Sequence, residues 1–156
     1  MSTNEAMVVS MPFTVTPEDT AAALGSGDLA VLATPRLVAW CEAATCAAAA
    51  PRLGAGDPAG SAGVSRTSVG VRVVIDHLVA SAVGDRVVVS AELLAQEGRE
   101  LVFRVTAVDA TPGRVDHAGE VAVEPGVASS AVVLARGEVR RVVVDTERFL
   151  GRLARR

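Results

Sequence analysis

The stretch ATPRLVAWCEAATCAAAAPRLG, residues 33–54, decides the fold of this chain. It predicts one long helix, because Pro35 suits the first helical position, and Pro51 and Gly54 are typical of a helix end. Thr34 is expected to be the N-cap residue, whose side chain satisfies a free backbone N–H group. The helix is apolar on nearly every face, and such a helix has to be covered on every side.

One charged residue, Glu42, interrupts this apolar helix between positions 37 and 51. An ion buried without a partner is costly, so Glu42 on a central helix would be paired, protonated or directed into a wet pocket. On a half-exposed helix, the same side chain would face solvent. The sequence favours neither interpretation, and the surroundings of Glu42 decide between them.

Strand-like sequence lies on either side of the helix, with apolar and polar residues alternating most clearly after it. Strands are expected at residues 8–16, 67–81, 84–98, 99–110 and 137–149. One strand, one long helix and a run of antiparallel strands predict an α+β fold. A single sheet covers only one side of the helix, so burial also predicts a homodimer in which the second copy covers the rest.

Segments rich in glycine and proline separate these elements. We expect a short helix or loop at 17–28, a flexible loop at 54–63, an insertion with a short extra strand at 110–134, and a fraying amphipathic tail at 150–156. A chain of 156 residues fits one domain of ordinary size. Residues 1–156 are therefore expected to form a single domain.

The composition narrows the functional classes. Half of the residues are hydrophobic and the formal net charge is −3. No apolar run reaches the ~18 residues of a membrane span, and the N-terminus lacks the features of a signal peptide, so we expect a cytoplasmic protein that contacts no membrane. Nothing suggests a basic footprint for nucleic acid. A few local arginines could still hold the phosphates of a CoA-type ligand.

Cys41 and Cys46 are the only cysteines. Their spacing on a helix turns the two side chains apart, which argues against a disulfide. Without nearby histidines they also make a poor zinc site. We expect them to be small apolar helix residues, and we expect neither a metal nor a cofactor.

Three further residues have both an ordinary and a functional interpretation. Thr34 lies at the positive end of the helix dipole, where a developing oxyanion would be stabilised. His77 lies in a valine-rich strand, where a histidine is often a packed core residue. Gly70 lies seven residues before it, and a glycine in a strand marks a bulge or the close approach of a ligand. Thr34 and Glu42 are separated by ~12 Å of helix rise, so they share a site only if the substrate lies along the helix or the preceding chain folds back over it.

Three features of the sequence resemble the hotdog-fold acyl-CoA thioesterases, and in particular the fluoroacetyl-CoA thioesterase family. TPRLVAWCE places a threonine eight residues before a glutamate. VGVRVVIDH places a glycine seven residues before a histidine. RVVVSAELLAQEGRELVFRVTAVD has the family's order of strand, tight turn and strand. The likeness covers residues 33–109 and resumes at ARGEVRRVVVDTERF.

The resemblance implies a hotdog fold, in which an antiparallel sheet wraps around one long central helix. It implies a thioesterase that hydrolyses a small acyl-CoA or acyl carrier protein thioester to the free acid and the thiol. Thr34, Glu42 and His77 would be catalytic, and the backbone of Gly70 would lie at the thioester and stabilise the oxyanion. The sequence leaves open whether Glu42 attacks directly or activates water.

Two segments depart from the family pattern. Residues 25–33 contain no aromatic residue, whereas aromatic residues line the acyl end in the fluoroacetyl-specific members. The insertion at 110–134 is longer than the family's usual turn.

Two other functions fit such a fold. A hotdog dimer could hold an acyl-CoA or a small hydrophobic ligand without turnover. An enoyl-CoA hydratase or dehydratase commonly uses an aspartate and a histidine a few residues apart at a helix start. Here Asp76 and His77 are adjacent on a predicted strand, which makes the hydratase the weaker of the two.

Overall fold

The computed structural model describes residues 7–54, 65–113 and 131–155. Its strands form one antiparallel sheet with the order β1-β3-β4-β5-β2. The strands are β1 (Val8–Thr14), β2 (Arg66–His77), β3 (Arg86–Glu97), β4 (Glu100–Asp109) and β5 (Val133–Asp145). The helices are the 3₁₀ turn η1 (Pro17–Asp19), α1 (Ala21–Leu24), α2 (Thr34–Leu53) and α3 (Thr146–Leu153).

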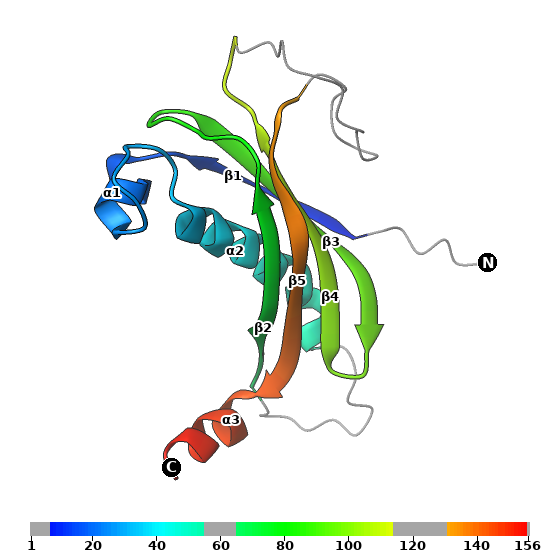
Figure 1. The fold of residues 1–156 in the computed structure, drawn as a ribbon. Helices are drawn as coiled ribbons and strands as arrows, with labels where there is room; N and C mark the ends of the chain where they lie inside the picture. The colour runs from blue at the N-terminus through cyan, green and yellow to red at the C-terminus, as the bar shows by residue number, and fades with distance from the viewer. Residues whose placement is uncertain (1–6, 55–64, 114–130, 156) are drawn as a thin grey trace, which may run out of the picture.

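The curved sheet passes across the long helix α2, which contacts all five strands (Figure 1). Side chains at intervals of three and four residues form the buried face of α2, as the helical period requires. They are Leu37, Trp40, Cys41, Ala44, Thr45, Ala48 and Ala49. The predicted α+β arrangement, an antiparallel sheet around one central helix, is confirmed.

Alternation decides which side of each strand enters the core. On β4 every second residue from Leu101 to Ala107 is buried, and the residues between them are half-exposed. The neighbouring strand β3 repeats this pattern from Val87 to Ala91. Each fully buried Val, Leu or Phe side chain stabilises the fold by roughly 1.5–3 kcal/mol relative to an exposed one. A slip of one residue in the β3–β4 or β4–β5 pairing would turn these buried side chains away from the helix, so their burial fixes the register of both pairs.

The C-terminal segment differs from the prediction. The sequence predicts a strand at 137–149 and a fraying tail, whereas β5 ends at Asp145 and α3 follows directly. The Asp145 side chain accepts a hydrogen bond from the backbone N–H of Arg148 at 2.9 Å. This N-cap starts a helix where the strand pattern would otherwise continue. The predicted strand at 67–81 is also shorter, since β2 ends at His77.

The face of α2 that points away from the sheet is open in this chain. Ala39, Cys46, Ala47 and Ala50 are exposed on it. The expectation that the helix is covered on every side is therefore not met within one chain. Because these exposed side chains are small, another chain could pack closely against this face of α2.

Other predicted segments have mixed outcomes. Residues 17–28 form η1 and α1, and Gly25 closes α1 with a φ of 70°, in the left-handed region that glycine favours. The predicted loop at 54–63 lies outside the described residues except for Gly54. Within the predicted insertion at 110–134, residues 114–130 lie outside them, and Val133 and Leu134 already belong to β5. No helix within the described ranges has the length and apolar character needed to span a bilayer.

Candidate active site

Thr34 and His77 are brought together across the start of α2. Thr34 Oγ1 lies 2.9 Å from His77 Nδ1, although 43 residues separate them in the sequence. Thr34 was predicted to be the N-cap, and this is wrong. The N-cap is Ala33, whose carbonyl accepts from the Leu37 N–H, so Thr34 is already helical. The hydroxyl is thus available for the imidazole.

The imidazole of His77 is half-buried at the end of β2. Burial lowers the pKa of His77 below its ordinary value of 6.5, and the nearby Val79 backbone offsets part of this shift. Nε2 is buried and makes no hydrogen bond of ordinary geometry with any described residue. The neutral ring therefore has Nδ1 on the Thr34 hydroxyl, while Nε2 is enclosed within the fold.

This shift gives an expected pH dependence. Desolvation disfavours the protonated ring, so His77 stays neutral until the pH falls below 6.5. If neutral His77 is needed for turnover, the acid limb of the kcat/KM profile has its midpoint below that value. Titration of the His77 ring signals by NMR should give the same midpoint. A midpoint above 6.5 for both the ring and the rate would contradict the assignment.

Glu42 and Gly70 form the second close pair, between α2 and β2. A Cβ placed on Gly70 would collide with Glu42 Oε1. The register of β2 with β5 also shifts between Gly70 and Arg72 and skips Val71, as in a β-bulge, which leaves its extra residue unpaired. The prediction that Gly70 marks a bulge is confirmed, and the close approach of a ligand there stays a prediction. The carboxylate group thus lies against an exposed backbone segment.

Arg141 on β5 gives Glu42 a partner that the sequence-based prediction missed. Arg141 Nη1 lies 3.6 Å from Glu42 Oε1, and the arginine side chain is only 6% exposed, whereas the glutamate side chain is 37% exposed. Glu42 is therefore paired, as one of the alternatives for a central helix requires, and its side chain is also partly exposed to solvent on a helix with an open face. Inward positions of β5 alternate, with Val139 buried and Val143 half-buried, so an arginine between these valines was the available signal.

Three hydrogen bonds hold Arg141 in place. Its Nε donates to Ser68 Oγ at 2.9 Å, its Nη2 to the Ser68 carbonyl at 3.0 Å, and its Nη1 to Thr45 Oγ1 at 3.4 Å. The Thr45 hydroxyl in turn donates to the Glu42 carbonyl at 2.7 Å. This network fixes a positive charge beside the carboxylate without a direct hydrogen bond to it.

The two pairs remain distinct within one chain. No hydrogen bond or ion pair found in the described residues joins Glu42 to Thr34 or His77. Along the axis of α2, Thr34 and Glu42 are separated by ~12 Å. Helical side chains lean toward the N-terminus, so the Glu42 side chain leans toward the level of Thr34 and narrows this gap.

Cys41 does not compete as a nucleophile. Both cysteines are free, with Cys41 buried and Cys46 exposed. Burial, and to a lesser extent the neighbouring Glu42, raises the pKa of Cys41 to about 12, so this thiol is not ionised at neutral pH. Across the described residues, no group of three or more histidine, cysteine or carboxylate side chains could hold a metal ion.

Comparison with known proteins gives a family match. The family model described as "Fluoroacetyl-CoA-specific thioesterase" (FlK) matches residues 15–118. No curated protein matches the chain. A solved mutant of FlK in complex with acetyl-CoA is 26% identical, with a TM-score of 0.70 over 96% of both chains. Another FlK mutant, in complex with fluoroacetate and CoA, is 26% identical with a TM-score of 0.65, over 92% of this chain and 97% of that one.

More distant structures share the fold. A thioesterase superfamily member from Thermus thermophilus is 22% identical, with a TM-score of 0.72 over 97% of this chain and 90% of that one. A hot-dog-like protein from Thermanaerovibrio acidaminovorans is 20% identical, with a TM-score of 0.70 over 96% and 90% of the two chains. The sheet and central helix described above thus form a hotdog fold, as predicted.

Proposed function

Because this chain belongs to the fluoroacetyl-CoA-specific thioesterase family, we propose that it hydrolyses a small acyl-CoA thioester at the surface between α2 and β2. The class of enzyme, an acyl-CoA thioesterase, follows from the family and the fold. The proposal concerns the site, its residues and the assembly. The observation that carries it is the contact of the Glu42 carboxylate with Gly70, beside the buried Arg141.

Glu42 is the residue that activates the attacking group. In the water-first route it accepts a proton from water, whose oxygen bonds to the thioester carbon. In the covalent route it attacks the carbonyl itself, and water then hydrolyses the anhydride. Either way the C–S bond breaks, the acid is released and the thiolate is protonated. Arg141 is a positioning residue, because it touches the carboxylate rather than the substrate.

The oxyanion needs donors that are already in place. The bulge beside Gly70 supplies backbone N–H groups that the ladder with β5 does not use, and the Thr34 hydroxyl is a second donor. His77 Nδ1 lies 2.9 Å from Thr34 Oγ1. In the tautomer with the proton on Nδ1, the ring donates to Thr34 Oγ1, which leaves the hydroxyl proton for the oxyanion. The neutral imidazole receives the proton released in the attack and passes it to the leaving sulfur. The thioester lies along α2 and so spans the gap between the two pairs.

A screen for thiol release tests this function. The panel contains acetyl-, fluoroacetyl-, branched, aromatic and longer acyl-CoAs, together with the matching acyl carrier protein thioesters. We expect release of free thiol from at least one short acyl-CoA. Binding of the whole panel without thiol release would contradict the proposal and favour a ligand-binding module. Crotonyl-CoA distinguishes a hydratase, because hydration leaves the thiol masked.

The assembly we propose is a homodimer that pairs through β2. This strand is at an edge of the sheet and exposes Val71, Val73 and Val74, with relative exposures of 55%, 37% and 46%. An apolar edge of this kind is a template for pairing with another chain. A second copy would also cover the open face of α2. Acyl-CoA esters are intracellular metabolites, so we place the reaction in the cytoplasm.

Light scattering after gel filtration checks the dimer. We expect the wild type to be a dimer and Val73→Asp to be a monomer with lower activity, because a carboxylate would be buried at the paired edge. Val8→Asp is the matched control at the other edge strand, where Val8 is 54% exposed, and it should remain a dimer. A monomeric wild type, or a Val73→Asp dimer, would rule out this interface.

A further inference from the structure

A buried threonine, Thr45, lies behind the Glu42–Arg141 pair. It comes three residues after Glu42 on α2, and its side chain is fully buried. Its hydroxyl donates to the Glu42 carbonyl oxygen at 2.7 Å and accepts from Arg141 Nη1 at 3.4 Å. A hydroxyl has one proton to donate. Because the carbonyl takes that proton, the threonine acts toward Arg141 only as an acceptor.

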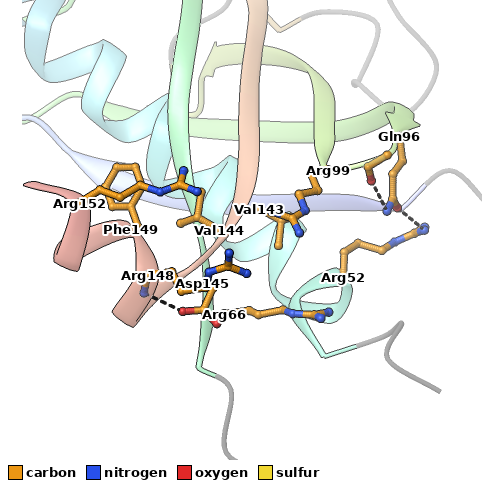
Figure 2. Close-up of a pocket in the computed structure, with 11 residues that line it drawn as sticks. Arg52, Arg66, Gln96, Arg99, Val143, Val144, Asp145, Arg148, Phe149 and Arg152 are labelled. Carbon is orange, nitrogen blue, oxygen red and sulfur yellow. Dashed lines mark hydrogen bonds between the residues drawn. The ribbon is translucent and has the colours of Figure 1, made fainter. Parts of the chain in front are cut away.

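Arg141 depends on acceptors inside the protein, because it is the only buried arginine in residues 7–54, 65–113 and 131–155. The arginines at the far end of α2 differ from it, since they line an open cavity of about 590 Å³ and reach solvent (Figure 2). A buried guanidinium group has five N–H donors to satisfy. Ser68 takes two of them, through its hydroxyl and its carbonyl, and Thr45 takes a third.

Nη1 of Arg141 lies between a neutral acceptor and a charged one. It is 3.4 Å from Thr45 Oγ1 and 3.6 Å from Glu42 Oε1, and the second distance is too long for a hydrogen bond. A hydrogen bond to a carboxylate is roughly twice as strong as one to a neutral oxygen. Without the threonine hydroxyl, Nη1 would therefore turn to Glu42 Oε1.

Glu42 Oε1 is the oxygen that such a hydrogen bond would occupy, and it is also the oxygen that lies against Gly70. A lone pair committed to a guanidinium N–H is not available to take a proton from water or to attack a thioester carbon. At 3.6 Å the positive charge stays beside the carboxylate but leaves this oxygen free.

We propose that Thr45 is a positioning residue, whose hydroxyl holds Arg141 just beyond hydrogen-bond distance of Glu42 and so keeps Glu42 Oε1 free to react. This assignment rests on the proposed function for the role of Glu42. It also explains why a polar side chain occurs on the buried face of α2 among alanines, which are Ala44, Ala48 and Ala49.

Thr45→Val tests the assignment, because valine keeps the branched shape of threonine and has a methyl group in place of the hydroxyl. We expect kcat to fall at least ~10-fold, part of the ~100-fold contribution of a positioned acid–base group, with KM nearly unchanged. Thr45→Ser keeps the acceptor and should recover most of the lost kcat. Thermal unfolding shows whether Thr45→Val is folded. If it is not, Thr45→Ala takes its place, since alanine also lacks the hydroxyl.

Thr111→Val is the matched control. The Thr111 hydroxyl also accepts one hydrogen bond, from the Arg86 N–H at 2.9 Å. It follows the end of β4, whereas Arg141 lies opposite the start of β4. Thr111→Val should lower stability but leave kcat and KM unchanged.

A second substitution shows whether Thr45 acts through Glu42. In the Glu42→Gln background, Thr45→Val should not lower the residual kcat further, because no carboxylate remains for Arg141 to capture. The assignment would be overturned by a wild-type kcat in Thr45→Val, by no recovery in Thr45→Ser, or by an equal loss in the Glu42→Gln background.

A crystal structure of Thr45→Val tests the positioning role independently of turnover. We expect the distance between Arg141 Nη1 and Glu42 Oε1 to shorten from 3.6 Å to about 2.8 Å, the length of a charge-assisted hydrogen bond. A shortened distance in a protein that hydrolyses no thioester would support the hold of Thr45 on Arg141 and contradict the proposed function alone. An unchanged distance contradicts the assignment even if the enzyme is active.

Discussion

Glu42→Gln is expected to lower kcat for the best acyl-CoA substrate at least ~100-fold, the usual scale for a positioned acid–base group. Glutamine keeps the size and shape of glutamate but can neither accept the proton of water nor attack a thioester. The amide still fits beside Gly70, and Arg141 keeps its three hydrogen bonds to Ser68 and Thr45. We therefore expect a folded protein with nearly unchanged KM. Thiol release measured at saturating substrate is the appropriate assay.

The matched control for this prediction is Glu92→Gln. Glu92 also pairs with an arginine, Arg104, at 3.0 Å, and its side chain is 29% exposed, close to the 37% of Glu42. It lies on β3, outside the proposed site. Loss of this surface pair costs at most about 1 kcal/mol of stability, and kcat should not change. The proposed role of this carboxylate would be contradicted if Glu42→Gln hydrolysed every substrate of the wild type at a near-normal rate.

Local signals were sufficient to predict most of the fold. The long helix follows from its proline, its closing glycine and its apolar composition, and the strands follow from alternation. The glycine at position 70 marked a bulge because few other causes keep a glycine inside a valine-rich strand. The strand end at Asp145 was missed because Thr146 and Phe149 continue the strand composition. Only the capping hydrogen bond from Arg148 decides for a helix.

Tertiary contacts account for what the sequence could not predict. A threonine before a proline is usually an N-cap, and the sequence therefore predicts that role for Thr34. Its hydroxyl instead pairs with His77, a residue whose position depends on the curvature of β2 over α2. The partner of Glu42 was missed for a similar reason. Arg141 comes 99 residues after Glu42 in the sequence, and only the pairing of β5 with β2 places it opposite Gly70.

Gly70→Ala is expected to lower kcat about 100-fold without loss of stability. The new Cβ would occupy the place of Glu42 Oε1, and the flexible carboxylate group would move aside rather than the backbone. A displacement of about 1 Å in a catalytic group costs ~100-fold in rate. Alanine is no worse than glycine inside a strand and restricts the unfolded chain more. Thermal unfolding should therefore be unchanged or occur at slightly higher temperature.

A double-mutant cycle separates displacement of Glu42 from damage to the backbone site. If Gly70→Ala acts by moving the carboxylate, adding it to Glu42→Gln should lower kcat little further, because the carboxylate is already gone. The losses in kcat from the two substitutions are then far from additive. Gly54→Ala is the control, because a Cβ there meets no atom within 4 Å. Fully additive losses would mean that Gly70 acts without Glu42. The close contact between strand and helix would then be a packing feature, and the attacking group would have to come from elsewhere in the enzyme.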